Sequence, residues 1–309
     1  MKFSKAIEGY KLSCLTEGYS PNTMEGYDWA LKKIETFLFD PNIEEITPED
    51  IKRVFFHLNI ETNLSSSSIQ SIWRSMRSFF NWATRELGIK RPDNYIPMPV
   101  SETKTVIPYS ASDLKSLIQG CDYTNKSNST RRKSFRMLRK TRYRDKAIIL
   151  LLLDTGLRVS ECTRLRISDI NLETGETIVR PFRKGRKSKS RVVFLGVNSR
   201  KALWRYLVDR DTEGDDPLFL SIKGKPMNRD SVRQMLVKLG KRVGIRNVHP
   251  HRFRHTFAIQ FLRNGGNVFE LQRLLGHSSL EMVKNYLALA QVDLEQAHRR
   301  ASPVDNWRL

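Results

Sequence analysis

Residues 249–258 of this chain are His249-Pro250-His251-Arg252-Phe253-Arg254-His255-Thr256-Phe257-Ala258. Proline is favourable at the start of a helix, and the pattern predicts a helix from here to the Asn-Gly-Gly stop at residues 264–266. His251 and Arg254 lie three residues apart and therefore share one helix face. Taken alone, they would be solvated surface groups. Four of the six histidines fall between residues 249 and 277, however, and this clustering beside arginines indicates a chemical site.

Four more groups extend this candidate site, namely Arg158, Lys184, His277 and Tyr286. Each also has an ordinary structural explanation. Arg158 could be a surface cation, His277 a helix cap, and Tyr286 a core or interface tyrosine. Together with the pair on the helix they comprise cations, proton-transfer groups and one hydroxyl nucleophile. That combination is suited to attack on a phosphodiester without a metal.

The charge balance indicates a polyanionic partner. The 309 residues include 54 Lys or Arg and 33 Asp or Glu, a formal net charge of +21. No run of about 18 apolar residues occurs, so the sequence predicts no membrane span, and the N-terminus lacks the apolar stretch of a signal peptide. Cys14, Cys121 and Cys162 are odd in number and far apart. This cysteine usage fits a reducing cytoplasm and argues against a disulfide framework and a zinc site.

The charge is divided unevenly, which predicts two domains. Residues 1–100 hold 12 Lys or Arg and 13 Asp or Glu (12 − 13 = −1), whereas residues 101–309 hold 42 and 20 (42 − 20 = +22). Prolines and β-branched residues between the two parts disfavour helix. We therefore expect a first domain over residues 1–100, a linker over 101–109, a second domain over 110–300 and a tail over 301–309.

The first domain is predicted to be all helical. Ser20-Pro21 and the serines of residues 65–68 are typical helix starts, each followed by apolar residues at three- and four-residue spacing. On the second of these helices, Arg74 and Arg77 share a face away from much of the apolar stripe. They could be solvated surface charges. Because a strongly basic domain follows, we expect them to contact nucleic-acid phosphates.

The second domain is predicted to be mixed. Helices are expected from Ser110 to Ile118, over residues 147–153 and again after Asn198. Two β-rich runs, 177–182 and 191–195, flank a hairpin with six cations between residues 183 and 191. Most of these cations would touch only backbone phosphates, among them Arg183, Arg186 and Lys187.

A second basic stretch precedes the helix over residues 147–153. Residues 131–146 hold nine Lys or Arg and one acid. Such a block is either a solubilising insertion or a nucleic-acid contact. Aromatic and apolar side chains interleave with these charges, and this favours the contact.

Two short helices near the C-terminal end, 268–275 and 280–289, resemble a helix-turn-helix. That motif binds the major groove without chemistry, so a non-catalytic DNA-binding regulator is a rival interpretation. The rival does not require His277 at the turn or Tyr286 late in the second helix. It also leaves the pair on the 250–264 helix without a role.

Four ordered motifs resemble those of the tyrosine site-specific recombinases, and the closest-looking branch is the Xer and phage or transposon integrase group. They are residues 155–161 (Thr-Gly-Leu-Arg-Val-Ser-Glu), 250–258, 274–279 (Leu-Leu-Gly-His-Ser-Ser) and Tyr286. The Ser-Pro-Asn-Thr start at residue 20 is similar to the family's core-binding domain. The resemblance covers nearly the whole chain. It implies a mainly α, two-domain, C-shaped DNA clamp: a helical, SAM-like core-binding domain and an α+β catalytic domain with a small β-sheet.

The resemblance also implies a reaction, in which duplex DNA is cut and rejoined through a 3′-phosphotyrosyl intermediate. Tyr286 would attack the scissile phosphate, and Arg158 and Arg254 would clamp its non-bridging oxygens. Lys184 would protonate the leaving 5′-oxygen, His251 would assist proton transfer, and His277 would donate a hydrogen bond to the phosphate. We also expect Arg252 to contact DNA. The covalent link conserves the bond energy, so no metal, ATP or other cofactor is implied.

Two departures from the family pattern bear on the assignment. The hairpin loop is about two residues longer than the usual Gly-Lys-Gly-Asn-Lys arrangement, so Lys187 and Lys189 compete with Lys184, although Lys184-Gly185 matches best. The basic stretch over residues 126–142 looks inserted relative to Xer-type chains. Its length and charge favour a mobile-element integrase or transposase over a chromosome or plasmid dimer resolvase.

The expected partners are double-stranded core recombination sites and, in the synaptic complex, three further copies of the chain. Free protein is expected to be a monomer or weak oligomer in the cytoplasm, associated with the nucleoid. In the family, C-terminal segments pass to a neighbouring protomer, which the 301–309 tail could do here. A type IB topoisomerase-like relaxing enzyme, with the same chemistry and no site preference, is a third interpretation.

Overall fold

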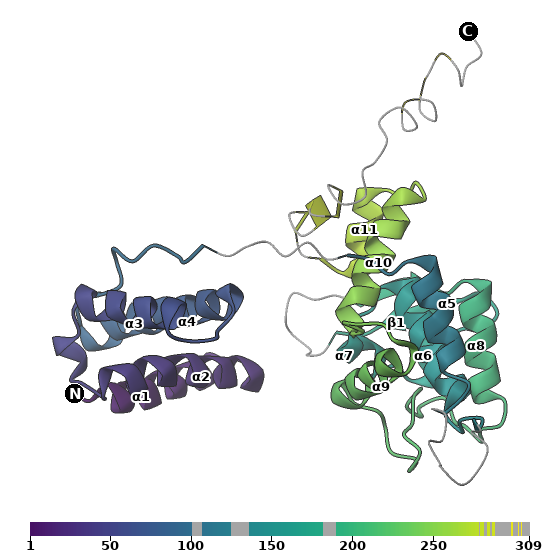
Figure 1. The fold of residues 1–309 in the computed structure, drawn as a ribbon, viewed down its shortest axis with the longest axis horizontal. Helices are drawn as coiled ribbons and strands as arrows, with labels where there is room; N and C mark the ends of the chain where they lie inside the picture. The colour runs from purple at the N-terminus through teal and green to yellow at the C-terminus, as the bar shows by residue number, and fades with distance from the viewer. Residues whose placement is uncertain are drawn as a thin grey trace. The chain divides into compact units, whose positions relative to one another are not determined.

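The computed structural model describes two compact units, Met1–Thr105 and Val106–Leu309 (Figure 1). The described residues are 1–100, 107–124, 136–181, 190–277, 279–280, 283–284, 286–287, 298, 302 and 304. Helices dominate both units, and a small two-stranded sheet lies in the second. The predicted mainly α fold class is therefore confirmed. Among the described helices, none combines the length and the apolar character needed to cross a membrane.

The described residues of the first unit, 1–100, form four helices, with a short 3-10 turn η1 (Ile43–Glu45): α1 (Phe3–Thr16), α2 (Pro21–Leu38), α3 (Pro48–Ile60) and α4 (Ser66–Leu87). Figure 1 shows α3 and α4 as a layer over α1 and α2. The expected caps are present, since Ser20 Oγ accepts from the Thr23 N–H at 3.2 Å and Ser65 Oγ accepts from the Ser68 N–H at 3.2 Å. Aromatic rings fill the core between the layers, and Phe3 meets Phe79 edge to face at 5.1 Å.

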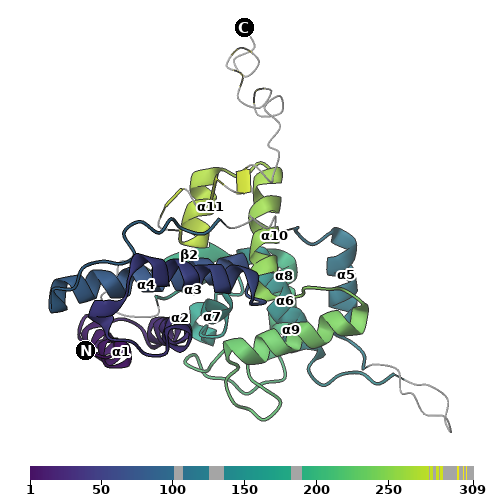
Figure 2. The same ribbon diagram turned by 60° about the vertical axis from the view of Figure 1, so that its left-hand side comes forward.

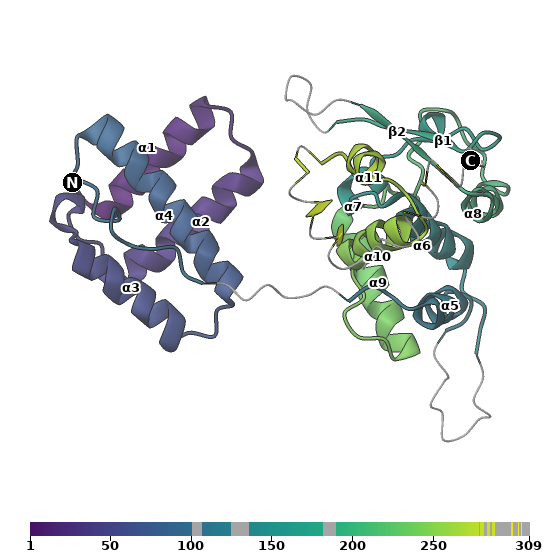
Figure 3. The ribbon, with the colours of Figure 1, turned by 90° about the horizontal axis from the view of Figure 1, so that it is seen from above.

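The second unit is built around α6. Its helices are α5 (Ala111–Gly120), α6 (Arg142–Thr155), α7 (Val159–Cys162), α8 (Val197–Leu207), α9 (Arg229–Val243), α10 (Pro250–Arg263) and α11 (Val268–Leu275), with a 3-10 turn η2 (Ile167–Asp169). Helix α6 packs on α8 and α10, and α5 packs on α9. Figures 2 and 3 show α10 between α11 on one side and α5 on the other. One apolar cluster joins most of these helices to the sheet.

Strands β1 (Glu176–Val179) and β2 (Arg191–Phe194) form an antiparallel pair in which Glu176 lies opposite Phe194 and Val179 opposite Arg191. The predicted β-rich runs are therefore strands, slightly shorter than expected. Strand β2 contacts both α6 and α11. This packing brings the start of β2 beside the C-terminal end of α11.

Gly156 ends α6 and lets three helices meet at one point. Its φ of +61° lies in the left-handed region, which favours glycine. A Cβ at this position would lie 2.4 Å from Phe257 Cδ1 on α10 and 2.7 Å from Leu275 Cδ2 on α11. The glycine therefore provides both the turn and the close approach, and its carbonyl faces the site described below.

Helix α6 begins at Arg142, five residues before the predicted start at residue 147. Two arginines at the end of the basic stretch are largely buried and do not extend into solvent. Asp145 is fully buried and binds Arg139 Nη2 at 2.8 Å and Arg144 Nη2 at 2.7 Å. Thr141 also donates to this carboxylate, at 3.1 Å. The predicted start was wrong because a run of cations does not reveal which of them enclose a buried acid.

We expect Asp145→Asn to lower the free energy of unfolding of this unit by about 3 kcal/mol, because it leaves two largely buried arginines without their anion. Chemical denaturation with a helix-sensitive signal measures the change. Asp230→Asn is the matched control, since the Asp230 side chain is 59% exposed and surface ion pairs contribute little. Equal effects of the two substitutions would contradict the assignment.

Candidate active site

Arg254 on α10 is the buried centre of the candidate site, with 4% of its surface exposed. Its Nη1 donates to the Gly156 carbonyl at 2.7 Å. Its Nη2 donates to the Leu275 carbonyl at 2.8 Å and lies 2.7 Å from His277 Nε2. Burial and the nearby charge of Arg158 lower the pKa of Arg254 to about 10, so the guanidinium stays charged at neutral pH. These bonds join the ends of α6 and α11 to α10.

His277 follows Gly276, which ends α11 with a φ of +63°. Because arginine only donates, His277 Nε2 accepts from Arg254, and the neutral ring carries its proton on Nδ1. Burial, followed by the charges of Arg254 and Arg158, lowers the pKa of His277 to about 4, so the ring is neutral at physiological pH. Nδ1 is buried and has no hydrogen-bond partner among the described residues. A buried N–H without a partner, next to cations, is suited to an anionic oxygen from outside the chain.

Arg158 lies at the N-terminus of α7, and its side chain is 39% exposed. Its backbone N–H donates to Glu161 Oε2 at 2.8 Å, and its Nη1 donates to Oε1 at 3.2 Å. Arg191 donates to the same two oxygens at 3.0 and 2.9 Å. Burial alone would raise the pKa of Glu161, but the hydrogen bonds and charge of Arg191, aided by Arg158, hold it below its usual value. A charged carboxylate therefore lies between two arginines.

Tyr286 is 7% exposed and packs in the apolar cluster that α10 and α11 share. Its ring centroid lies 5.5 Å from that of His255 and 6.5 Å from that of His277. Burial raises the pKa of Tyr286, and the charges of Arg254 and Arg158 offset only part of this increase. The phenol is therefore protonated at neutral pH, and it needs a base in order to become a nucleophile.

His251 lies on the exposed face of α10, one turn before Arg254. Burial, the neighbouring His249 and the charge of Arg254 lower its pKa. The ring is therefore neutral near pH 7 and able to accept a proton. The structure thus brings Arg158, Arg254, His277 and Tyr286 together, with His251 close enough to respond to their charges.

Several predicted residues lie outside the described part of the chain. They are Lys184, Arg183, Arg186 and Lys187, together with the competing Lys189. Their expected roles stay predictions. The second helix of the helix-turn-helix interpretation, 280–289, is described only at positions 280, 283, 284, 286 and 287.

Arg252 makes internal contacts that the sequence did not predict. Its Nε donates to the Ile107 carbonyl and its Nη1 to the Arg246 carbonyl, both at 3.0 Å. The guanidinium also lies over the Tyr109 ring at 4.1 Å. Arg252 therefore fastens the start of this unit to α10, and its DNA contact stays a prediction.

The two arginines on α4 differ from each other. Arg74 is exposed, and its Nη2 donates to Gln70 at 3.3 Å. Arg77 lies 3.6 Å from the fully buried Asp93 and stacks on Trp73. Arg77 thus helps to hold the segment after α4, whereas Arg74 presents a charge to solvent. Phosphate contact by either residue stays a prediction.

Glu161 and Arg191 are site residues that the sequence motifs do not predict. Glu161 lies three residues after Arg158, a position from which an acid commonly caps a helix start, and this spacing was the available signal. Arg191 offered no such signal. Its partners lie 30 and 83 residues away in the chain.

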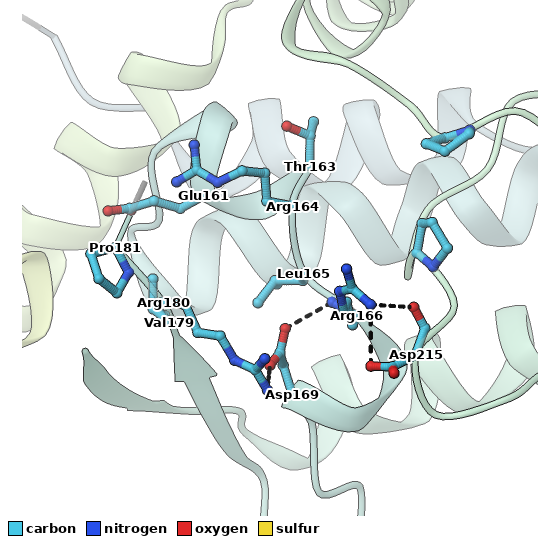
Figure 4. Close-up of a pocket in the computed structure, with 12 residues that line it drawn as sticks. Glu161, Thr163, Arg164, Leu165, Arg166, Asp169, Val179, Arg180, Pro181 and Asp215 are labelled. Atoms are coloured by element: carbon cyan, nitrogen blue, oxygen red, sulfur yellow. Dashed lines mark hydrogen bonds and ion pairs between the residues drawn. The ribbon is translucent and has the colours of Figure 1, made fainter. Parts of the chain in front are cut away.

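A pocket of about 540 Å³ shares Glu161 with the candidate site, and this residue lies on the pocket wall (Figure 4). In its lining, Arg166 pairs with Asp215 at 3.1 Å and Arg180 pairs with Asp169 at 2.8 Å. The charges of the lining balance, because three arginines face three carboxylates. The pocket lining therefore carries no net formal charge, whereas Arg158, Arg191 and Arg254 outnumber Glu161 in the candidate site. Within the described parts of the chain, no group of His, Cys, Asp or Glu side chains is placed to hold a metal ion.

The lowered pKa of His277 predicts a pH dependence of stability. An unfolded histidine takes up a proton near pH 6.5, whereas folded His277 does so only near pH 4. Between these values the unfolded state binds more protons, so stability falls as the pH falls from about 6.5 to 4. As the pH falls across this window, we expect the melting temperature of His277→Gln to decrease less than that of wild type. Above pH 7 we expect the two melting temperatures to differ by a constant amount. If the melting temperatures of the two proteins change in parallel from pH 8 to 4, His277 is not the group that causes this pH dependence.

The arrangement suits an anion with developing negative charge. Arg254 is bonded to the neutral imidazole of His277, the charge of Arg158 is close enough to lower the pKa values of both groups, and the buried phenol of Tyr286 lies beside the imidazole ring. Two backbone carbonyls hold the central arginine in place. Fixed donors of this kind stabilise a charged transition state without reorganisation. The phenol beside them is the available nucleophile among the groups of this cluster.

Comparison with known proteins agrees with this chemistry. Residues 111–292 match the phage integrase family, and residues 7–87 match the phage integrase N-terminal SAM-like domain. Tyrosine recombinase XerD of Staphylococcus epidermidis is 30% identical over 301 residues, covering 94% of this chain and 95% of the relative. Tyrosine recombinase XerD of Staphylococcus haemolyticus is 29% identical over 307 residues, covering 96% and 98%.

Solved structures share the fold. The Tn1549 transposon integrase in complex with a circular intermediate DNA superposes with a TM-score of 0.77 at 21% identity, covering 96% of this chain and 99% of that chain. A lambda integrase dimer bound to a COC′ core site gives 0.72 at 19% identity, covering 91% and 97%. The family match spans more than half of the chain, so the non-catalytic regulator interpretation is set aside. The chain belongs to the phage integrase family of tyrosine recombinases, enzymes that cleave and rejoin DNA.

Proposed function

We propose that Tyr286 is the nucleophile of this recombinase and that Arg158, Arg254 and His277 hold the scissile phosphate. One observation carries the proposal: His277 contacts both Arg254 and Tyr286, and its buried Nδ1–H lacks a partner among the described residues. A phosphate oxygen would satisfy this donor. The arginines would bind the non-bridging oxygens, for which guanidinium geometry is suited.

The proposed step is a transesterification. A bond forms between Tyr286 Oη and phosphorus, and the bond between phosphorus and the 5′-oxygen breaks, leaving a 3′-phosphotyrosyl link. The phenol proton passes to a neutral base, for which His251 is proposed. Its lowered pKa supports this role. Lys184 is proposed to protonate the leaving 5′-oxygen. The reverse reaction with another 5′-hydroxyl rejoins the DNA.

We further propose that the substrate is a duplex core site and that the physiological role is integration or transposition of a mobile element. The basic stretch over residues 126–142 supports this role, since it adds positive charge between α5 and α6. Among its described residues, Leu138 pairs with Tyr123 in an antiparallel bridge. A Xer-type dimer resolvase is the second candidate. Two relatives of this chain are named tyrosine recombinase XerD, and their alignments cover 96% and 94% of it. We also propose that four copies of the chain assemble on two DNA core sites, and that the reaction takes place in the cytoplasm.

Mapping covalent adducts distinguishes these roles. Fragmented DNA from the source genome is incubated with the protein, denatured, and recovered through the protein–DNA link for sequencing. Cleavage at the two ends of a movable segment is the expected result. A single recurrent chromosomal position would favour the resolvase, and positions scattered over random sequence would favour a type IB topoisomerase-like enzyme.

A further inference from the structure

Arg191, the first residue of β2, contacts three separate parts of the site. Its Nη1 and Nη2 donate to the two carboxylate oxygens of Glu161 at 3.0 and 2.9 Å, and its Nε donates to the Leu274 carbonyl at 2.7 Å. The side chain is 16% exposed. Space for it is provided by Gly276, where a Cβ would lie 3.0 Å from Arg191 Nη1.

The contact with Leu274 places Arg191 at the end of α11. Leu274 lies three residues before His277, and the next carbonyl, of Leu275, accepts from Arg254. Two arginines from different elements thus bind successive carbonyls of one helix end. The orientation of His277 depends on that helix end, because its own N–H donates to the Gln272 carbonyl.

The contact with Glu161 has an electrostatic consequence. Glu161 is 10% exposed and its Oε1 lies 3.2 Å from Arg158 Nη1, so by itself it would neutralise Arg158. Arg191 supplies the balancing charge. With His277 neutral, Arg158, Arg191 and Arg254 against Glu161 give 3 − 1 = +2. This matches a phosphoryl group whose charge approaches −2 as the phenolate attacks, whereas without Arg191 the sum is +1.

We propose that Arg191 is a positioning residue for strand cleavage: it offsets the charge of Glu161 so that Arg158 remains available to the phosphate, and it fixes the α11 end that presents His277. This inference rests on the proposed function, since it assigns Arg191 a part in the same reaction. Arg191 acts through Glu161 and the α11 end and does not itself touch the reacting atoms.

A charge-restoring pair of substitutions tests the proposal. Cleavage of a nicked duplex is followed in a single turnover at saturating protein, for wild type, Arg191→Met, Glu161→Gln and the double variant. Arg191→Met is expected to slow cleavage on the order of 100-fold with little change in DNA affinity. The double variant is expected to recover at least about tenfold of that loss, because a neutral amide at position 161 no longer neutralises Arg158. Rates are compared per folded molecule, so a merely structural role, in which Arg191 only stabilises the fold, predicts the wild-type rate in every variant.

Arg200→Met is the matched control. Arg200 donates to the carbonyls of Leu172 and Glu173, away from the cluster, and its loss should leave the cleavage rate unchanged. Arg191→Lys keeps a charge but not the three bonds, and it covers the case in which Arg191→Met does not fold. It is expected to fold and to cleave about tenfold more slowly than wild type, with unchanged DNA affinity.

Wild-type cleavage rates in Arg191→Met or Arg191→Lys would overturn the inference, as would a double variant no faster than Arg191→Met. These outcomes leave the proposed function standing, because the wild-type protein still forms an adduct. Failure of wild type itself to form an adduct would overturn the proposed function and this inference with it.

Discussion

Tyr286→Phe is expected to abolish the covalent protein–DNA adduct while leaving DNA binding and stability unchanged. The substitution removes only the hydroxyl, and the ring keeps its packing beside His255 and His277. Without the oxygen no phosphotyrosyl bond can form, so the rate of adduct formation should fall by at least about 10⁴-fold. Denaturing gels of a labelled suicide duplex measure the adduct, and mobility shift measures binding.

Tyr206→Phe is the matched control for this substitution. The Tyr206 hydroxyl accepts from the Leu220 N–H at 3.0 Å and from Arg210 at 3.2 Å, away from the cluster. Its loss should lower stability and leave the rate of adduct formation per folded molecule unchanged. An adduct formed by Tyr286→Phe at the wild-type rate would show that another group is the nucleophile.

Arg254→Lys is expected to slow cleavage by about 10²- to 10³-fold. Lysine keeps the charge, but a single ammonium cannot reach the Gly156 carbonyl, the Leu275 carbonyl and His277 while also binding a phosphate. Those buried acceptors would then lack their donors, which also lowers stability by about 1–3 kcal/mol. Single-turnover cleavage, corrected for the folded fraction, separates the two effects.

Arg252→Ala provides the comparison on the same helix. Arg252 also binds two backbone carbonyls, those of Ile107 and Arg246, but it is not bonded to His277. We expect its loss to lower stability, while the rate of the chemical step at saturating protein changes by less than about tenfold. Equal losses of rate in Arg252→Ala and Arg254→Lys would mean that the effect of Arg254 is structural.

Much of the helical framework could be predicted because its signals are local. Ser20, Ser65 and Ser110 each cap the helix that the sequence predicts, and Gly276 ends α11 where expected. Helix α6, in contrast, begins five residues before its predicted start. The buried Asp145 draws two arginines into the fold, and a sequence pattern cannot separate them from solvated neighbours.

The candidate site is predictable only in part, because a local sequence pattern does not record contacts between residues that are far apart in the chain. Arg158, His277 and Tyr286 lie in motifs whose order and spacing are visible in the sequence. The partners of Arg191 depend on how β2 packs against α7 and α11, which no local pattern records. Similarly, nothing local distinguishes a DNA-facing arginine from Arg252, whose acceptor at Ile107 lies 145 residues away.

The most direct test of the account identifies the residue and the DNA end that are joined. Wild-type protein is incubated with a nicked suicide duplex, the adduct is digested with nuclease and protease, and the modified peptide is sequenced by mass spectrometry. We predict a nucleotide remnant on Tyr286, linked through the 3′-phosphate, in a reaction that leaves a free 5′-hydroxyl. A link to any other residue, a link to the 5′ end, or no adduct with any candidate site would contradict it.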